Sequence, residues 1–467
     1  MRIALVNSNR VKPPIAPIGL EYVAESVSRG GYPVEVLDLC WAEDWEKEIE
    51  SFFRYNEFEV IGVTLRNTDD CAYPGETFIP EFVKIVNCLR IHSNGFLVIG
   101  GVGFSVMPRE VLELCQADFG IWGDGEFTLL ECLSRMEKKS EWRGVPGVVH
   151  KFEGEWKINP PPHDCSVLKL PSMTRQWINN IRYFSEGGQI GFESKRGCAG
   201  RCIYCADPVA RGKKVKIRPP KDVADELEKL LQQGINCFHT CDSEFNLPED
   251  HARAVCEEII RRNDNSLFWY AYCTPLPFSR DLAKKMKQAG CVGINFGVDS
   301  GDPEMLKRLK RNFTPEDIIE VARICRDEGI IVMFDLLLGG PGETRDSIIQ
   351  TITLMKEAEP DRVGVSVGLR VYPGTELADQ LGKKSTRQIK INPVDLLNPV
   401  FFLEPEVAPF IFELLDKSIA NDPRFLFFDS TRPAQNYNYN SNQRLVEAIR
   451  KGYRGAYWDI LRRYFNR

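Results

Sequence analysis

The chain lacks several features that mark particular classes of protein. No uninterrupted apolar run reaches the ~18 residues that a membrane-spanning helix needs, so we expect no membrane span. The formal net charge of −6 provides no overall positive field that would attract nucleic acid, and we expect no nucleic acid partner. The segment from Met1 to Val6 is typical of a short strand and not of a secretory leader, which predicts that the protein is not exported.

Cysteine is present only at moderate density, with 15 residues among 467. Disulfide frameworks occur mainly in short, cysteine-dense secreted chains, so these thiols favour a reducing compartment and we expect a cytoplasmic protein. The length exceeds what one hydrophobic core supports and predicts about three domains. A hydrophobic content of 43% and a charged content of 27% are ordinary for a globular protein, so function must be sought in the motifs.

Residues 1–143 alternate short apolar runs with amphipathic segments. The runs that predict strands are Ile3–Val6, Val34–Leu37, Val60–Val63, Phe96–Ile99 and Ala117–Trp122. Continuous apolar strands separated by helices are typical of a doubly wound parallel sheet, so we predict an α/β, Rossmann-like domain. A ligand of such a domain would bind at the carboxyl ends of its strands. Residues 144–186 predict a hairpin followed by a proline-punctuated linker.

Residues 187–383 resume the alternation of strand and helix. The six predicted strands are Gln189–Glu193, Cys237–His239, Phe268–Tyr272, Val292–Phe296, Ile331–Leu337 and Val363–Val367. Six βα units predict a partial (β/α)6 barrel of the TIM type, whose chemistry lies at the carboxyl ends of the strands. Beyond it, residues 384–467 predict a mainly helical C-terminal segment.

Three cysteines lie on one short segment of the second domain. Cys198, Cys202 and Cys205 have the spacing C-x3-C-x2-C. Thiolates are the protein ligands of a [4Fe–4S] cluster, and three of them leave the fourth iron open to an outside ligand. A structural zinc site would need a second ligand pair, and none lies nearby. Cys237 and Cys241 flank the end of a predicted strand, so we do not expect their side chains to converge on one metal.

This cysteine loop, with Tyr204 between its last two cysteines, resembles that of the radical SAM enzymes. The resemblance implies a [4Fe–4S] cluster on Cys198, Cys202 and Cys205, with S-adenosylmethionine (SAM) bound to the open iron. Further matches follow strands two, four, five and six, as Asp242–Asn246, Gly297–Gly301, Gly339–Glu343 and Arg370–Thr375. An acidic loop and a helix cap remain the plain alternatives for the first and third of these matches.

The same resemblance assigns roles around SAM. An ammonium group needs an anionic or hydroxyl acceptor, for which Asp242 is the first choice, with Ser243 and Glu244 next. Asp299 and Ser300 would lie by the ribose, and the glycines around Gly340 would let backbone approach the adenine. The SAM-binding residues that the resemblance implies are Tyr204, Asp242, Ser243, Glu244, Asp299, Ser300, Gly340 and Arg370.

The first domain resembles cobalamin-binding domains at the ends of its third and fourth strands. Gly100-Gly101 matches a signal of that family, and Val63-Thr64-Leu65 matches a second one loosely. The Asp-x-His-x-x-Gly signal is absent, and no histidine precedes His92, so we expect no histidine on the cobalt. The cobalamin-binding residues that the resemblance implies are Thr64, Leu65, Arg66, Gly100, Gly101, Val102 and Gly103. A strand-to-helix turn for the glycines, and a solvated loop for Arg66, remain open alternatives.

The C-terminal segment predicts a helix over Val407–Ile419 and an amphipathic helix from Leu445 to Leu461. Such a segment could cover the open side of a partial barrel and exclude water from it. For the stretch containing Tyr437 and Tyr439, contact with a substrate and plain packing remain equally open.

Taken together, the resemblance covers about residues 1–385 and implies a cobalamin-dependent radical SAM enzyme. Such an enzyme would methylate an unactivated carbon through a 5′-deoxyadenosyl radical and methylcobalamin. The implied cofactors are a [4Fe–4S] cluster, SAM and cobalamin. The implied partners are a small-molecule or peptide substrate and an external electron donor of the flavodoxin or ferredoxin type. A radical cyclase or rearrangement enzyme with the same cofactors, and a non-catalytic iron–sulfur electron-transfer protein, are the alternatives.

Overall fold

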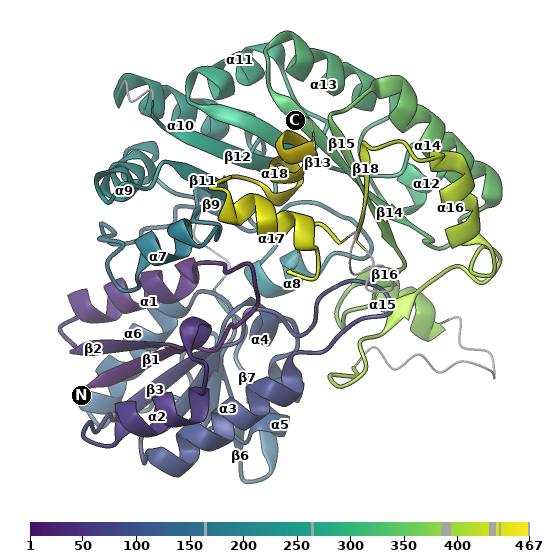
Figure 1. Cartoon of the computed structure of the whole chain (residues 1–467). Helices are drawn as coiled ribbons and strands as arrows, with labels where there is room; N and C mark the ends of the chain where they lie inside the picture. The colour runs from purple at the N-terminus through teal and green to yellow at the C-terminus, as the bar shows by residue number, and fades with distance from the viewer. Residues whose placement is uncertain (163–165, 263–265, 384–393, 429–435, 439, 466–467) are drawn as a thin grey trace.

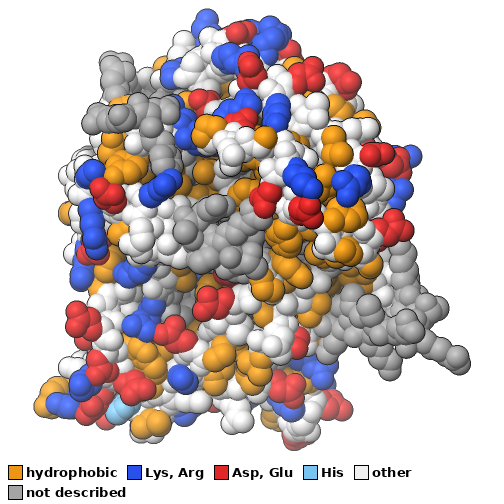
Figure 2. Space-filling view, turned by 45° about the vertical axis from the view of Figure 1, so that its right-hand side comes forward, with side chains coloured by type: hydrophobic (Ala, Val, Ile, Leu, Met, Phe, Trp, Pro, Cys, Tyr) orange, Lys and Arg blue, Asp and Glu red, His pale blue; other side chains and the backbone are white. Residues whose placement is uncertain are grey.

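The computed structural model describes residues 1–162, 166–262, 266–383, 394–428, 436–438 and 440–465. Two seven-stranded sheets organise the chain, one in the N-terminal half and one in the C-terminal half (Figure 1). Within the described ranges, no helix is both long enough and apolar enough to cross a membrane. Basic and acidic side chains intermingle over the face drawn in Figure 2.

The N-terminal sheet has the strand order β2-β1-β3-β4-β5-β6-β7. Its strands are β1 Ile3–Asn7, β2 Val34–Asp38, β3 Val60–Thr64, β4 Phe96–Gly100, β5 Phe119–Ile121, β6 Val148–Phe152 and β7 Glu155–Ile158. Strands β1 to β5 run parallel, which confirms the predicted doubly wound sheet. The hairpin β6–β7 pairs antiparallel with β5 and extends the same sheet.

Helices cover both faces of this sheet because its strands are apolar on both sides. Along β1, Ile3 and Leu5 pack against α1 and α6, whereas Ala4 and Val6 pack on the opposite side, where α2, α3 and α5 lie. The helices of this half are α1 Ile18–Arg29, η1 Leu39–Trp41 (one 3₁₀ turn), α2 Trp45–Phe53, α3 Ile79–His92, α4 Val102–Val106, α5 Pro108–Cys115 and α6 Gly125–Glu137.

The C-terminal sheet is parallel, with the order β18-β15-β14-β13-β12-β11-β8. It curves into a partial barrel with a row of helices on its outer face (Figure 1). Its strands are β8 Gly191–Phe192, β11 Cys237–Thr240, β12 Phe268–Cys273, β13 Cys291–Asp299, β14 Ile331–Leu338, β15 Arg362–Val367 and β18 Phe425–Phe428. The first six confirm the predicted βα units, while β18 is a further strand that the C-terminal segment contributes.

The outer helices are α9 Pro220–Gln232, α10 Glu249–Arg262, α11 Arg280–Gln288, α12 Pro303–Arg308, α13 Pro315–Asp327, α14 Arg345–Ala358 and α16 Ile411–Ile419. Short elements connect the halves or cross the barrel mouth: α7 Asn180–Ser185, α8 Asp207–Arg211, α15 Glu376–Lys383, and the two-stranded pairs β9 Lys195–Arg196 with β10 Lys216–Ile217 and β16 Leu369–Arg370 with β17 Phe401–Phe402. These short elements place the cysteine loop and Arg370 at the barrel mouth.

The C-terminal segment differs from the expected single amphipathic helix after Leu445. Two helices form instead, α17 Gln443–Arg450 and α18 Tyr457–Phe465, with Gly452 and Gly455 at positive φ between them. Both helices pack into the concave side of the barrel, where Leu445 and Ile460 share a core with Tyr270 and Met333. The predicted helix over Val407–Ile419 is shorter and begins at Ile411. Tyr439 and residues 384–393 lie outside the described residues.

Candidate functional site

The cysteine loop runs between β9 and α8, directly after the first barrel strand. The Gly200 backbone N–H donates to Cys198 Sγ at 3.3 Å. A Cβ added to Gly200 would lie 3.1 Å from Cys198 Sγ and 3.9 Å from Cys202 Sγ, so both sulfurs lie over this glycine. All fourteen cysteines in the described ranges are free thiols. The loop thus presents its thiols together, with no side chain at Gly200 between them.

A cluster fits this loop better than a single metal ion does. In the described part of the chain, no three His, Cys, Asp or Glu side chains converge as ligands of one ion. Each thiolate of an iron–sulfur cluster binds a different iron, so its cysteines need not converge. Burial raises the pKa of Cys198, Cys202 and Cys205, which a bound metal would reverse by favouring the thiolates. Arg311 Nη1 lies 2.8 Å from Cys202 Sγ and would offset their negative charge.

The residues of the acidic run after β11, Asp242 to Glu244, have different partners. Asp242 accepts hydrogen bonds from the backbone N–H groups of Ser194 and Lys195, at 2.8 and 3.2 Å, and from Ser194 Oγ at 2.5 Å. Its carboxylate therefore fastens the strand that leads into the cysteine loop and has little capacity left for an ammonium group. Ser243 Oγ donates to Asp207.

Glu244 has the least engaged carboxylate of the run. Its Oε1 lies 3.9 Å from Arg311 Nη2, and its side chain is 17% exposed. Burial raises the pKa of Glu244 to about 7, against the opposing pull of Arg311 and Lys195. This makes Glu244 a better candidate than Asp242 for the acceptor of a SAM ammonium group.

Asp299, after β13, and Tyr204 of the cysteine loop form one contact. Tyr204 Oη donates to Asp299 Oδ2 at 2.5 Å, and Arg311 Nε lies 3.3 Å from the same oxygen. Asp299 adopts a φ of +65°, an uncommon conformation for a residue with a side chain. Asp299 is thus held at the barrel mouth by partners on both sides. Arg311 is a site residue that no motif indicated.

Three of the expected SAM contacts have other partners. Ser300 Oγ lies 3.1 Å from Thr351 Oγ1 and accepts from the backbone N–H of Asp302, the residue that caps α12, so its hydroxyl is engaged inside the protein. Gly340 packs against Met305 and Leu309.

Arg370, the third of these, donates through Nε and Nη2 to Asp69 Oδ2, at 3.0 and 2.8 Å. This buried ion pair joins the barrel to the N-terminal domain. We expected Arg370 to bind SAM. In the structure its guanidinium instead pairs with Asp69.

A cavity of about 420 Å³ lies at the carboxyl ends of β1, β3 and β4 and extends to the barrel. Of the expected cobalamin-binding residues, Thr64, Arg66, Gly100, Gly101 and Val102 line it. Gly103 lines a neighbouring cavity of about 120 Å³, and Leu65 is buried. We refer to the larger space as the interdomain cavity. It lies where an α/β sheet binds its ligand, and Gly62 and Gly100 leave its floor open.

Gly101 is required by the backbone itself. It has a φ of +101°, and an added Cβ would lie 2.4 Å from the Leu65 carbonyl oxygen. A side chain there would push apart the two turns that form one edge of the cavity. The turn interpretation of Gly101 is thus supported by its backbone, and it is compatible with a ligand beside Gly100-Gly101.

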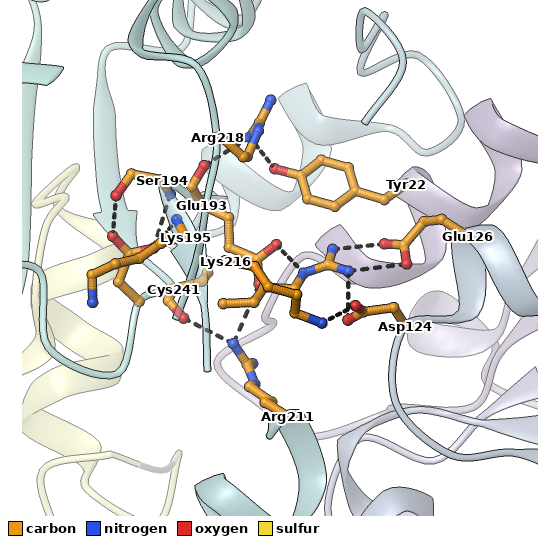
Figure 3. A network of polar contacts seen from close by, with 12 residues as sticks. Tyr22, Asp124, Glu126, Glu193, Ser194, Lys195, Arg211, Lys216, Arg218 and Cys241 are labelled. Atoms are coloured by element: carbon orange, nitrogen blue, oxygen red, sulfur yellow. Dashed lines mark hydrogen bonds and ion pairs between the residues drawn. The ribbon is translucent and has the colours of Figure 1, made fainter. Parts of the chain in front are cut away.

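The run Gly123-Asp124-Gly125-Glu126 after β5 also lines the interdomain cavity, although it was not among the predicted site residues. Its signal was available, because glycines and acids directly after a parallel strand mark a ligand edge. Asp124 and Glu126, which Figure 3 labels, pair with Arg196 of the barrel at 3.1 and 2.6 Å. Arg196 also pairs with Glu193 at 2.8 Å. This buried network joins the two domains beside the cavity.

A second space, of about 70 Å³, lies on the concave side of the barrel, and we call it the lumen cavity. Strands β11 to β14 supply His239, Tyr270, Tyr272, Asn295 and Asp335, and the C-terminal segment supplies Tyr437, Asn438, Ala456, Tyr457 and Trp458. Gln189, His239 and Tyr272 line both this space and the interdomain cavity. The two spaces therefore share a wall, and the C-terminal segment closes the lumen cavity.

Two family models match the chain in its two halves. Residues 5–133 match the B12 binding domain, and residues 192–355 match the radical SAM superfamily. Tryptophan 2-C-methyltransferase of Streptomyces laurentii is 30% identical, over 82% of this chain and 74% of that protein. Hopanoid C-3 methylase of Methylococcus capsulatus is 23% identical, over 78% of this chain and 68% of that protein.

Solved structures agree with these relatives. The radical SAM methyltransferase TsrM of Kitasatospora setae, with tryptophan and a SAM analog bound, superposes with a TM-score of 0.89. The sequences are 29% identical, and the match covers 99% of this chain and 98% of that one. The same protein with cobalamin and a [4Fe–4S] cluster bound gives a TM-score of 0.88 at 27% identity, over 100% and 98% of the two chains.

Proposed function

Because this chain belongs to the family of cobalamin-dependent radical SAM methyltransferases, we propose that it methylates a carbon of a small aromatic molecule that the lumen cavity holds by one end. The observation that carries the proposal is the shared wall of Gln189, His239 and Tyr272. A cobalamin in the interdomain cavity and a substrate in the lumen cavity would meet across this wall. When bound, the cluster and SAM supply one-electron chemistry, and cobalamin supplies a transferable methyl group.

The cysteine loop holds the cluster through Cys198, Cys202 and Cys205. The free thiols, the absence of a side chain at Gly200 and the cation of Arg311 beside Cys202 support this assignment. Glu244 accepts the SAM ammonium group, since the oxygens of Asp242 already accept hydrogen bonds from Ser194 and Lys195. The hydrogen bond from Tyr204 to Asp299 joins the cysteine loop to the end of β13 and holds both in position at the barrel mouth.

The interdomain cavity holds cobalamin. Thr64, Arg66, Gly100, Gly101 and Val102 line its N-terminal side. Arg66 lies on the N-terminal side of the cavity, which contributes no histidine to the lining, and no described carboxylate pairs with its guanidinium. A cation there would disfavour further positive charge on a cobalt ion bound nearby.

An external one-electron donor of the flavodoxin or ferredoxin type would complete the system, because a [4Fe–4S] cluster must itself be reduced before it can pass an electron to SAM. A reducing compartment such as the cytoplasm suits the free thiols of the described ranges. The barrel contributes exclusion of water, with the C-terminal segment closing the lumen cavity.

The proposal is tested with SAM carrying a ¹³C-labelled methyl group. Reconstituted protein, a reductant and tryptophan, the substrate named for two relatives, should give a product heavier by one labelled methyl group. Cys198→Ala should abolish the product and lower the iron content, whereas Cys88→Ala, on α3, should change neither. If the label reaches cobalamin but not tryptophan, the substrate is another molecule. If SAM is consumed while its methyl group stays in methionine, a cyclase or rearrangement activity replaces the proposed one.

A further inference from the structure

The lumen cavity contains a carboxylate that has no cationic partner among the described residues. Asp335, on β14, accepts a hydrogen bond from Tyr437 Oη at 3.2 Å, and the Asn295 side chain also donates to it. No Lys, Arg or His of the described ranges forms an ion pair with it. Burial raises the pKa of Asp335 to about 6, a measure of how poorly the site solvates a negative charge. A buried carboxylate without a counter-ion is costly, and a bound cation would offset that cost.

Further acceptors and donors around the cavity are also unsatisfied. Asn295 Oδ1, Tyr457 Oη and both ring nitrogens of His239 have no hydrogen-bond partner among the described residues. These three residues are 7%, 3% and 6% exposed, so the vacant atoms are not bonded to bulk water. Buried polar atoms are almost always paired in folded proteins, so vacancies that line one cavity indicate a polar ligand.

Aromatic rings form the rest of the wall. Tyr270, Tyr272, Tyr437, Tyr457 and Trp458 line the cavity, and His239 stacks on Tyr270 with ring centroids 5.2 Å apart. Burial lowers the pKa of His239 to about 3, so its ring is neutral at ordinary pH and does not repel a cation. A cage of aromatic rings with one carboxylate is the arrangement that binds organic ammonium groups, through the negative faces of the rings.

The backbone leaves room for the carboxylate. Asp335 pairs in register with Gly364 of β15. A Cβ at Gly364 would lie 2.3 Å from Asp335 Oδ1 and 2.9 Å from Tyr437 Oη. The absence of a side chain at this position thus permits the contact between Asp335 and Tyr437. About 10–15 Å³ of such space holds one water, so 70 Å³ admits about five to seven non-hydrogen atoms, the end of a substrate and not all of it.

We propose that the lumen cavity binds the protonated amine of the substrate, with Asp335 as its counter-ion and Asn295 Oδ1 as a second acceptor. The substrate is therefore an amine-bearing molecule whose ammonium end enters the aromatic cage. Its remaining atoms extend toward the wall of Gln189, His239 and Tyr272, where the carbon to be methylated meets the interdomain cavity. This inference rests on the proposed function, because it takes the lumen cavity as the substrate site.

The test compares three small probes on the protein reconstituted with cluster and cobalamin. Tryptamine carries an ammonium group, indole-3-propionate carries only a carboxylate, and tryptophan carries both. By isothermal titration calorimetry, the wild type should bind tryptamine and tryptophan about tenfold or more tightly than indole-3-propionate, since a charge-assisted hydrogen bond in a buried site is strong.

Two variants in the cavity and one control on the surface distinguish a loss of amine binding from a general loss of stability. Asp335→Asn should weaken the binding of tryptamine and tryptophan about tenfold. The binding of indole-3-propionate should stay unchanged or become slightly tighter. Asn295→Leu removes the second acceptor. It should weaken the binding of tryptamine and tryptophan by a smaller factor than Asp335→Asn does. Asp327→Asn, the same change on an exposed part of α13, should bind all three probes as the wild type does.

The inference is overturned if neither amine binds the loaded wild type, if indole-3-propionate binds best, or if Asp335→Asn leaves the amines unaffected. Iron content and the absorbance of bound cobalamin are read on every sample. Wild-type protein that takes up neither cofactor would contradict the proposed function, whereas loaded protein that ignores the amines contradicts only the ammonium site.

Discussion

His239 is buried in the wall between the interdomain cavity and the lumen cavity. The described residues offer no hydrogen-bond partner for its ring nitrogens, and burial lowers the pKa of His239 from 6.5 to about 3. In the unfolded chain the imidazole takes up a proton near pH 6.5, whereas in the folded protein it stays neutral to about pH 3. The unfolded state binds more protons between these values, so this residue lowers the free energy of unfolding as the pH falls below 6.5.

We therefore expect His239→Gln to reduce the acid sensitivity of the protein. The wild type should lose up to about 1.4 kcal/mol per pH unit more than the variant does below the unfolded-state pKa. Urea unfolding of the cofactor-free chain between pH 7.5 and 5 measures this difference. His92→Gln, near the end of α3, serves as the control and should follow the wild type. Parallel curves for wild type and His239→Gln would contradict the low pKa.

At the same scale, local motifs indicate candidate site residues only where their neighbours are close in the chain. The spacing of Cys198, Cys202 and Cys205 is local, and so is the acidic run that contains Glu244. Arg370 and Ser300 were different, because their partners Asp69 and Thr351 lie 301 and 51 residues away. No local pattern indicates such a pairing, and the same holds for Arg311 beside Cys202.

At the scale of elements, periodicity predicted the strands that are buried on both faces. Most of the parallel strands from β1 to β15 follow apolar runs, whereas the hairpin β6–β7 is largely exposed at its far end, and the structure confirms the doubly wound sheet and the partial barrel. The strand β18 was missed, although Phe425-Leu426-Phe427-Phe428 is apolar, because it follows a helix of the C-terminal segment that seemed to lie outside the barrel pattern. Its pairing with β15 is a tertiary contact that the sequence does not show.

The helix pair α17–α18 closes the concave side of the barrel, and this packing gives a prediction. Ile460 is fully buried with Leu445, Met333 and Tyr270. Ile460→Ala should lower the free energy of unfolding by about 2–5 kcal/mol, through lost burial and a residual cavity. Hydrogen exchange should rise first in residues 443–465 and stay slow in the N-terminal sheet.

A matched control is Ile349→Ala on α14, where the side chain is 40% exposed. Surface substitutions of this kind change stability by about 0.5 kcal/mol or less. An equal loss of stability for the two variants, or uniform exchange across the chain, would show that α17 and α18 are not a separately docked cover.

At the scale of the whole molecule, buried ion pairs join the two α/β halves. Arg175, from the segment between the halves, pairs with Glu21 of α1 at 2.8 Å and with Glu226 of α9 at 2.7 Å. The side chains of Arg175 and Glu21 are fully buried, and Arg218 pairs with the same Glu226 at 2.8 Å. The Arg196 network beside the interdomain cavity and the Arg370–Asp69 pair add two further links. These links fix how the two cavities face each other.

Such links are specific because breaking one leaves a charge buried and unpaired. Arg175→Met keeps an unbranched apolar side chain and removes the cation that Glu21 and Glu226 share. We expect a loss of about 3–5 kcal/mol in the free energy of unfolding, because a buried carboxylate without its partner is penalised. Arg323→Met removes an exposed pair with Glu320 and should cost about 0.5 kcal/mol or less.

Urea unfolding followed by tryptophan fluorescence measures both variants. A common midpoint for the two would mean that the interface does not depend on Arg175, whereas a loss confined to Arg175→Met, with weaker cobalamin retention, would show that this arginine holds the two halves in register around the cofactor.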